Sequence, residues 1–175
     1  MIRAGRILAL ALAALICLSG CSTAVDRPPV DRPPVDSPAG PAAGNRTAEL
    51  RDAAVRVAEQ TAVAVASLDH RDGDADYDRL LALLSGAARQ EWEQQRAEKL
   101  AALTSDAVTA ERIVVAASGV AALDPAAPTA TVLVAASARI AGKQAPAPEE
   151  HRYRLRMSLT RTADEWKASE LQFVS

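Results

Sequence analysis

Four aspartates stand at every second position from Asp72 to Asp78, which is the residue type and spacing of a calcium-binding loop. Such a loop also requires a glycine at its sixth position and a glutamate at its twelfth. Those two positions hold Tyr77 and Leu83. We therefore predict no metal ion here, and we expect the acidic run to be a solvated turn that ends one helix and begins the next.

Catalysis would need chemistry of another kind. A general acid or base requires a titratable side chain with a shifted pKa inside an apolar pocket. His151 is the candidate base, although a single histidine at the start of a strand is more often exposed or simply hydrogen-bonded. The pattern offers no paired carboxylates and no nucleophile beside a base. We predict no catalytic residue, no cofactor and a protein that is not an enzyme.

Cys21 carries the clearest chemical signal in the chain. It directly follows the small residues Ser19 and Gly20, which come after an apolar run from Ile7 to Leu18, and Arg3 and Arg6 precede that run. This order of basic, apolar and small residues is typical of an export signal. The run from Ile7 to Leu18 has 12 residues, whereas a membrane-spanning helix needs about 20.

The stretch Leu18–Cys21 resembles the lipobox of bacterial lipoproteins. The resemblance implies cleavage between Gly20 and Cys21, with acyl chains such as palmitate on the new first residue. We predict a signal peptide at residues 1–20 and a lipid anchor at Cys21, which together place the protein on the extracytoplasmic face of the cell membrane. A spanning anchor and an exported protein without lipid are the alternatives.

Residues 21–45 are predicted to form a disordered tether after the lipidated cysteine. Residues 26–30, Asp-Arg-Pro-Pro-Val, are repeated at once as residues 31–35. Proline fixes φ and removes a backbone donor, and the segment has few large apolar side chains to bury, so an extended spacer is expected. A ligand for an aromatic groove is the alternative.

Charge and cysteine content restrict the partners of the mature protein. Loss of Arg3 and Arg6 with the signal leaves 18 basic against 22 acidic residues, a net charge of −4. Nucleic-acid binding normally needs a strongly basic surface, so we predict no nucleic-acid partner. Cys17 leaves with the signal and Cys21 carries lipid, so no internal disulfide is expected.

The remaining residues 46–175 are expected to form one α+β domain. Three apolar stripes of helical spacing precede four β-rich runs with short connections, which favour antiparallel pairing. We predict three N-terminal helices packed on a curved four-stranded antiparallel sheet, with Asn45 and Ser85 as helix caps and Gly119 at a bulge. The expected helices are 46–68, 77–84 and 87–103, and the expected strands are 113–123, 131–140, 151–160 and 166–174.

The third predicted strand alternates most regularly. Arg152, Arg154 and Arg156 alternate with Tyr153 and apolar residues, so these arginines are expected on the outer face of the sheet. They are a candidate interaction surface for anionic lipid headgroups or an acidic partner. A charged row that keeps an exposed strand soluble and discourages edge pairing is the alternative.

Three aromatic residues, Trp92, Tyr153 and Trp166, are candidates for the ring of a small lipid-accepting cavity, with ordinary core packing as the alternative.

Several short stretches, taken in order, are similar to actinobacterial Mce-associated proteins, the accessory proteins of mammalian-cell-entry lipid importers. The resemblance implies a nuclear transport factor 2-like cone and a non-enzymatic accessory or scaffold of a Mce-type lipid import system, with Mce subunits as partners. The alternatives are a lipid- or steroid-binding cone and an isomerase- or hydrolase-like enzyme. The stretches are Tyr77-Asp78, Ser85-Gly86, the third helix with Trp92, Gly119-Val120, 130–134, the Arg/Tyr strand and the last strand with Trp166.

Overall fold

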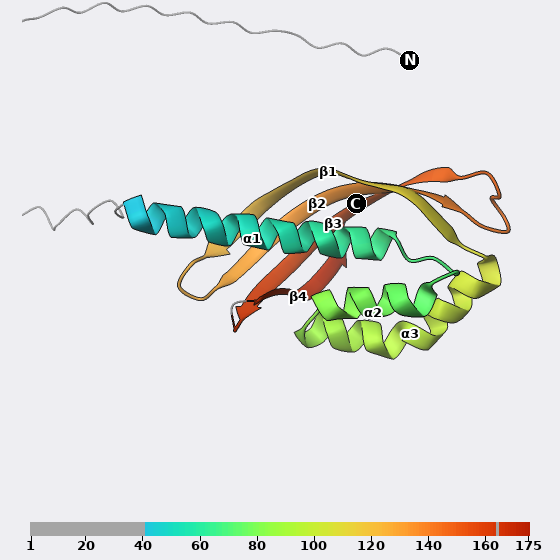
Figure 1. Cartoon of the computed structure of the whole chain (residues 1–175), viewed down its shortest axis with the longest axis horizontal. Coiled ribbons are helices and arrows are strands. Elements are labelled where there is room, and N and C mark those ends of the chain that lie inside the picture. Colours follow the sequence, from blue (N-terminus) through green and yellow to red (C-terminus); the bar gives the residue numbers. More distant parts are fainter. Residues whose placement is uncertain (1–40, 164) are drawn as a thin grey trace, which may run out of the picture. The chain divides into compact units, whose positions relative to one another are not determined.

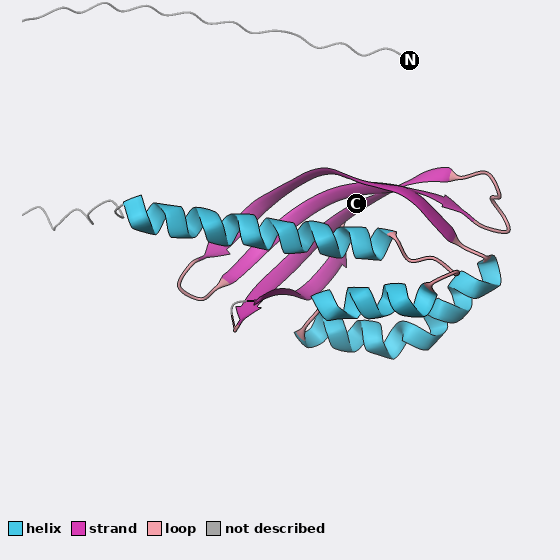
Figure 2. Ribbon diagram, viewed as in Figure 1, coloured by secondary structure: helices cyan, strands magenta, loops and turns pink. Residues whose placement is uncertain are grey.

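The computed structural model describes residues 41–163 and 165–175. Within those residues, three helices precede four strands, so the predicted α+β class and element order are confirmed (Figures 1 and 2). The predicted signal peptide, Cys21 and most of the tether lie outside the described residues. The elements are α1 (Pro41–Ala66), α2 (Gly73–Leu83), α3 (Gly86–Asp106), β1 (Thr109–Asp124), β2 (Thr129–Ala141), β3 (Glu149–Thr162) and β4 (Glu165–Phe173).

The four strands form one antiparallel sheet in the order β1-β2-β3-β4. Short connections between consecutive strands account for this order, since a parallel neighbour would need a long crossover. Consequently β1 and β4 are the edge strands, and β3 lies between β2 and β4. The pairing of Leu133 with both Gly119 and Arg156 defines the register across β1, β2 and β3.

One face of the sheet is covered by α1, which crosses it as a single long helix (Figure 1). Ala54, Ala58 and Ala62 are fully buried there, and their four-residue spacing places them on one helix face. Alanine has little side-chain bulk, so the helix backbone lies close to the sheet. The cluster also contains Leu50, Ala130, Val132, Val134, Ala136, Leu155, Met157, Leu159 and Trp166.

A second core cluster joins α2 and α3 to β4. Tyr77, Leu80 and Leu84 are almost completely buried in it, together with Trp92. The backbone also links the two parts, because Leu84 bridges to Ala168 and the amide of Ser85 donates to the carbonyl of Ala168 at 2.8 Å. The helices α2 and α3 therefore lie at the β4 side of the sheet (Figure 2).

Two details of the helices differ from the prediction. The N-cap predicted at Asn45 is wrong, because α1 already begins at Pro41. Proline is favoured at the first helical position, where its missing amide donor costs nothing, and the following residues continue the helix. Ser85 does occupy the N-cap of α3, but its side chain makes no capping hydrogen bond.

The bulge predicted at Gly119 is also displaced. Gly119 pairs regularly with Leu133, and the register shifts lie on either side of it, between Val115 and Ala117 and between Val120 and Ala122. Bulges concentrate on edge strands, where they bend the strand and interrupt pairing with other chains. No helix in the described part of the chain is long and apolar enough to span a membrane.

Candidate functional site

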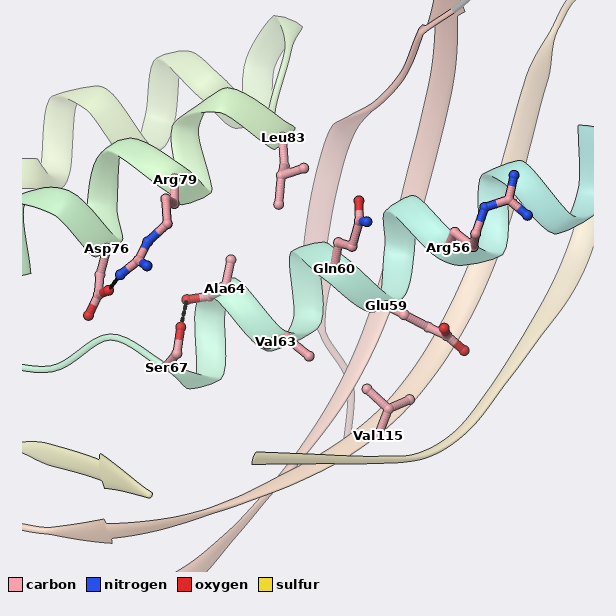
Figure 3. Close-up of a pocket in the computed structure, with 10 residues that line it drawn as sticks. All are labelled: Arg56, Glu59, Gln60, Val63, Ala64, Ser67, Asp76, Arg79, Leu83 and Val115. Atoms are coloured by element: carbon pink, nitrogen blue, oxygen red, sulfur yellow. Dashed lines mark hydrogen bonds and ion pairs between the residues drawn. The ribbon is translucent and has the colours of Figure 1, made fainter. Parts of the chain in front are cut away.

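The largest hollow that we describe is an open groove of about 770 Å³ beside α1, bordered by α2 and β1 (Figure 3). Pockets that bind small molecules commonly have volumes of roughly 300–1,000 Å³. We call it the α1–α2 groove. Its lining residues are Arg56, Glu59, Gln60, Val63, Ala64, Ser67, Asp76, Arg79, Leu83 and Val115.

Helix α1 supplies half of the ten lining residues, and Ser67 directly follows it. Residues 56, 60, 63 and 64 recur at helical spacing, so they share a face of α1 that is turned away from the alanines on the sheet. Val63 is 39% exposed, which is high for an aliphatic side chain. Leu83 of α2 and Val115 of β1 extend this apolar surface on the two sides of the helix (Figure 3).

Charged groups border the apolar part of the groove. Asp76 is buried in the first turn of α2 and forms an ion pair with the exposed Arg79. The helix N-terminus stabilises this carboxylate further, because the helix dipole is positive there. On the β1 side, the hydroxyl of Ser118 donates to the carboxylate of Glu59 at 2.6 Å. Arg56 makes no ion pair within the part of the chain that the structure describes.

The groove therefore offers binding chemistry of a particular kind. Its apolar centre and charged border suit an elongated molecule with an apolar body and a polar end. Among residues 41–163 and 165–175, no group of three or more His, Cys, Asp or Glu side chains is arranged to hold a metal ion.

The three aromatic candidates do not meet in one cavity. Trp92 is buried in the second cluster, where the hydroxyl of Tyr77 donates to its carbonyl at 2.8 Å. Trp166 belongs to the first cluster, and Tyr153 packs against that cluster half-buried. Burial raises the pKa of the Tyr153 hydroxyl. None of the three lines the α1–α2 groove.

The arginine row lies where the alternation predicted it. Arg152, Arg154 and Arg156 are exposed, while Leu155 and Met157 point into the core. The alternative of edge protection does not apply to Arg156, because this residue pairs with residues on both neighbouring strands. At Arg152, by contrast, β4 no longer lies alongside, and β3 pairs with β2 alone.

His151, the candidate base, lies apart from the groove, and two aspartates of the acidic run form ion pairs with an arginine. His151 is exposed at the start of β3, opposite Ala138. Arg96 of α3 binds the carboxylates of Asp74 and Asp78, at 2.9 and 2.5 Å. These two acidic groups thus connect α2 to α3.

Asp69 is a buried carboxylate that sequence analysis did not single out. It accepts hydrogen bonds from the amide and the guanidinium of Arg71 and from the amide of Ala110, the last at 3.1 Å. These donors, the Arg71 side chain foremost, lower its pKa from 3.8 to about 2 against the opposing effect of burial. Next to it, the amide and Nδ1 of His70 donate to the carbonyl of Val108, at 2.9 and 2.7 Å. The signal available in the sequence was the polar turn itself, but nothing in it indicates contact with Val108 and Ala110, which are 38 and 41 positions from their partners.

An open antiparallel sheet with one helix across its face and a helical hairpin at its edge defines a class of small α+β domain. Residues 43–175 match the family described as "Uncharacterized protein Rv1363c/MT1408-like", and the chain belongs to that family. No curated protein sequence matches this chain.

Solved structures with a similar fold share little sequence with this chain. An IcmL-like type IV secretion system protein from Legionella pneumophila superposes with a TM-score of 0.56 at 10% identity, covering 69% of this chain and 88% of that one. The periplasmic domain of DotI gives 0.56 at 11% identity, covering 70% and 94%. A Novosphingobium aromaticivorans protein, provisionally assigned as an aromatic ring hydroxylase, gives 0.50 at 14%, covering 73% and 94%. At such identities the likeness concerns the fold alone.

Proposed function

We propose that this chain is a non-enzymatic, lipid-anchored accessory or scaffold protein on the extracytoplasmic face of the cell membrane. The observation that carries the proposal is Cys21 directly after Leu18–Gly20, at the end of an apolar run too short to span a membrane. One acyl chain binds a membrane weakly, whereas two or more chains hold a protein there stably. A similar fold in the periplasmic domain of DotI supports the same compartment.

The partner we propose is a Mce-type lipid import complex. The support is the order of sequence stretches that resembles Mce-associated proteins. The sheet that α1 covers is also curved, as expected for a nuclear transport factor 2-like cone (Figure 1). This proposal requires that the protein copurify from native membranes with Mce subunits. Neighbouring genes that encode such subunits and their permeases would add support, and copurification with unrelated proteins alone would refute it.

The anchor is tested by replacing Cys21→Ala and fractionating the cells. The variant lacks the acylated sulfur, so it is expected to leave the membrane fraction. Cys17→Ala is the matched control, because this cysteine lies inside the signal and is removed with it. Undiminished membrane retention of Cys21→Ala, or a bare Cys21 sulfur in the mass of the native protein, would overturn the proposal.

A second candidate function, lipid binding, is favoured by the α1–α2 groove. Its volume of about 770 Å³ and its apolar centre are suited to an acyl chain or a sterol-sized molecule. Native mass spectrometry of the protein purified from membranes should then detect a bound lipid. Val63→Glu in the groove should remove this lipid, and Ala101→Glu at an exposed position of α3 should retain it. If no lipid is bound to the wild-type protein, the result favours the scaffold function over lipid binding.

A further inference from the structure

The sheet face opposite α1, here called the outer face, combines small residues, exposed aliphatic side chains and arginines. It is formed by the odd-numbered residues of β2 and the even-numbered residues of β3, since the even-numbered β2 residues and the odd-numbered β3 residues enter the core. Leu133 is 46% exposed on it, and Val174, just beyond β4, is 39% exposed. Within the described residues, no helix lies on this face (Figure 2).

A shallow hollow of about 280 Å³ lies on the outer face between β1 and β3. Ala117, Gly119 and Ala135 have side chains too small to fill it, so Leu133 and Val174 border a recess at the sheet surface. Arg154 lies at the same hollow. Apolar groups and a guanidinium therefore share one small area.

The arginines of this face are available for an external anion. Arg154 and Arg156 make no ion pair with any residue that the structure describes, and Arg152 forms an exposed pair with Glu150 at 3.3 Å. Glu170, on the neighbouring strand β4, accepts a hydrogen bond from Ser158. Guanidinium groups bind phosphate through paired donors and are less strongly hydrated than ammonium groups.

We propose that the outer face binds the surface of an anionic phospholipid bilayer. Arg154 and Arg156 contact headgroup phosphates, while Leu133 and Val174 enter the boundary between headgroups and acyl chains. Adjacent aliphatic and cationic groups on an unfilled surface match an anionic lipid surface in both charge and polarity. The inference rests on the proposed lipid anchor, which holds the domain beside a membrane.

Residues 22–175 contain no cysteine, so a single cysteine introduced there can be labelled with a dye at that one position. Leu133→Cys, labelled with a polarity-sensitive dye, reports contact at the outer face of the full-length mature protein. Gln94→Cys, on an exposed position of α3, is the matched control. Both labelled proteins are reconstituted in phosphatidylcholine vesicles with and without phosphatidylglycerol, and flotation of the vesicles measures anchoring separately.

The expected result is a blue-shifted emission at residue 133 in the phosphatidylglycerol vesicles, a smaller shift in neutral vesicles or high salt, and none at residue 94. In the double variant Arg154→Gln/Arg156→Gln, the ratio of contacting to free domain should fall about tenfold or more. Arg46→Gln/Arg51→Gln, at exposed positions of α1 outside the groove, removes the same charge and should have little effect.

A dye at residue 133 that stays in water while the protein floats with phosphatidylglycerol vesicles would overturn the inference and leave the anchor intact. Flotation of Cys21→Ala with anionic but not neutral vesicles would support the outer face without the anchor. Failure of the wild-type protein to float with any vesicle refutes both. If the emission of the dye at residue 133 is blue-shifted in native membranes but not in phosphatidylglycerol vesicles, the outer face binds a protein partner and lipid binding is refuted.

Discussion

Asp69 shows how one carboxylate can hold a junction between a helix and a sheet. It lies three residues after the end of α1, and its partners are Arg71 in the following turn and Ala110 at the start of β1. Hydrogen bonds to a charged group in a buried position are stronger than neutral ones. Asp69 therefore connects the turn that follows α1 to the start of β1.

Replacing Asp69→Asn is expected to lower the free energy of unfolding by about 2 kcal/mol at pH 7, because a pKa lowered from 3.8 to about 2 reports that much stabilisation of the ionised form. The folded-state pKa is depressed, so the contribution is complete above pH 3.8 and is lost as the pH falls through about 2. Urea denaturation between pH 7 and 2 should show the two proteins converging in acid. Asp72→Asn, exposed and without a capping bond, should change stability by less than about 0.5 kcal/mol. A constant difference at all pH values would contradict this account.

At the scale of secondary-structure elements, α1 depends on small residues against the sheet. Ala58→Leu adds three heavy atoms at a position that is 0% exposed, and overpacking of this kind typically costs about 1–3 kcal/mol. Thermal denaturation should show the loss, whereas Arg51→Leu on the exposed face of the same helix should be nearly neutral. Equal stability of the two variants would mean that α1 does not pack tightly on the sheet.

The C-terminus of α3 offers the opposite change, a stabilising one. Ala107 has a left-handed φ of 49°, and the amides of Ala107 and Val108 donate to the carbonyls of Thr104 and Leu103, at 3.2 and 3.0 Å. This pair of bonds is the Schellman motif, in which glycine is preferred at the left-handed position. Ala107→Gly should raise the free energy of unfolding by roughly 0.5–1 kcal/mol, since relief of about 1–2 kcal/mol of strain exceeds the entropy lost by glycine. A destabilised variant in urea titration would contradict this.

Elements with a regular pattern were predictable from the sequence, and places where distant elements meet were not. The alternation around Arg154 indicated both the strand and its exposed face, because a strand's side chains alternate whatever packs on it. On α1 the small Ala58 is fully buried against the sheet while its larger neighbour Val57 is only half-buried, which apolar character alone does not indicate. The α1–α2 groove combines Val63, Leu83 and Val115, which lie far apart in the sequence. Their relative position depends on how the helices pack, which periodicity does not contain.

The whole domain has two apolar clusters that share little. The first joins α1 to the inner face of the sheet, and the second joins α2 and α3 to β4. Leu171 packs against both clusters, and the bridge from Leu84 to Ala168 adds a backbone connection. Such a division favours local opening of α2 and α3 while the sheet and α1 remain folded.

Native-state hydrogen exchange distinguishes this two-part behaviour from a single cooperative unit. Leu155→Ala in the first cluster should lower the opening free energy of β2 and β3 amides by about 2–5 kcal/mol, and α2 and α3 should be unaffected because they open without disturbing that cluster. Leu84→Ala should lower the protection of α2, α3, β2 and β3. The contacts of Leu84 stabilise the native state, and they are lost both when α2 and α3 open locally and when the whole domain unfolds. If Leu155→Ala lowers the protection of α2 and α3 as much as that of β2, the two clusters unfold together. In that case the outer face and the α1–α2 groove belong to one rigid body, and a ligand at either would stabilise the whole domain equally.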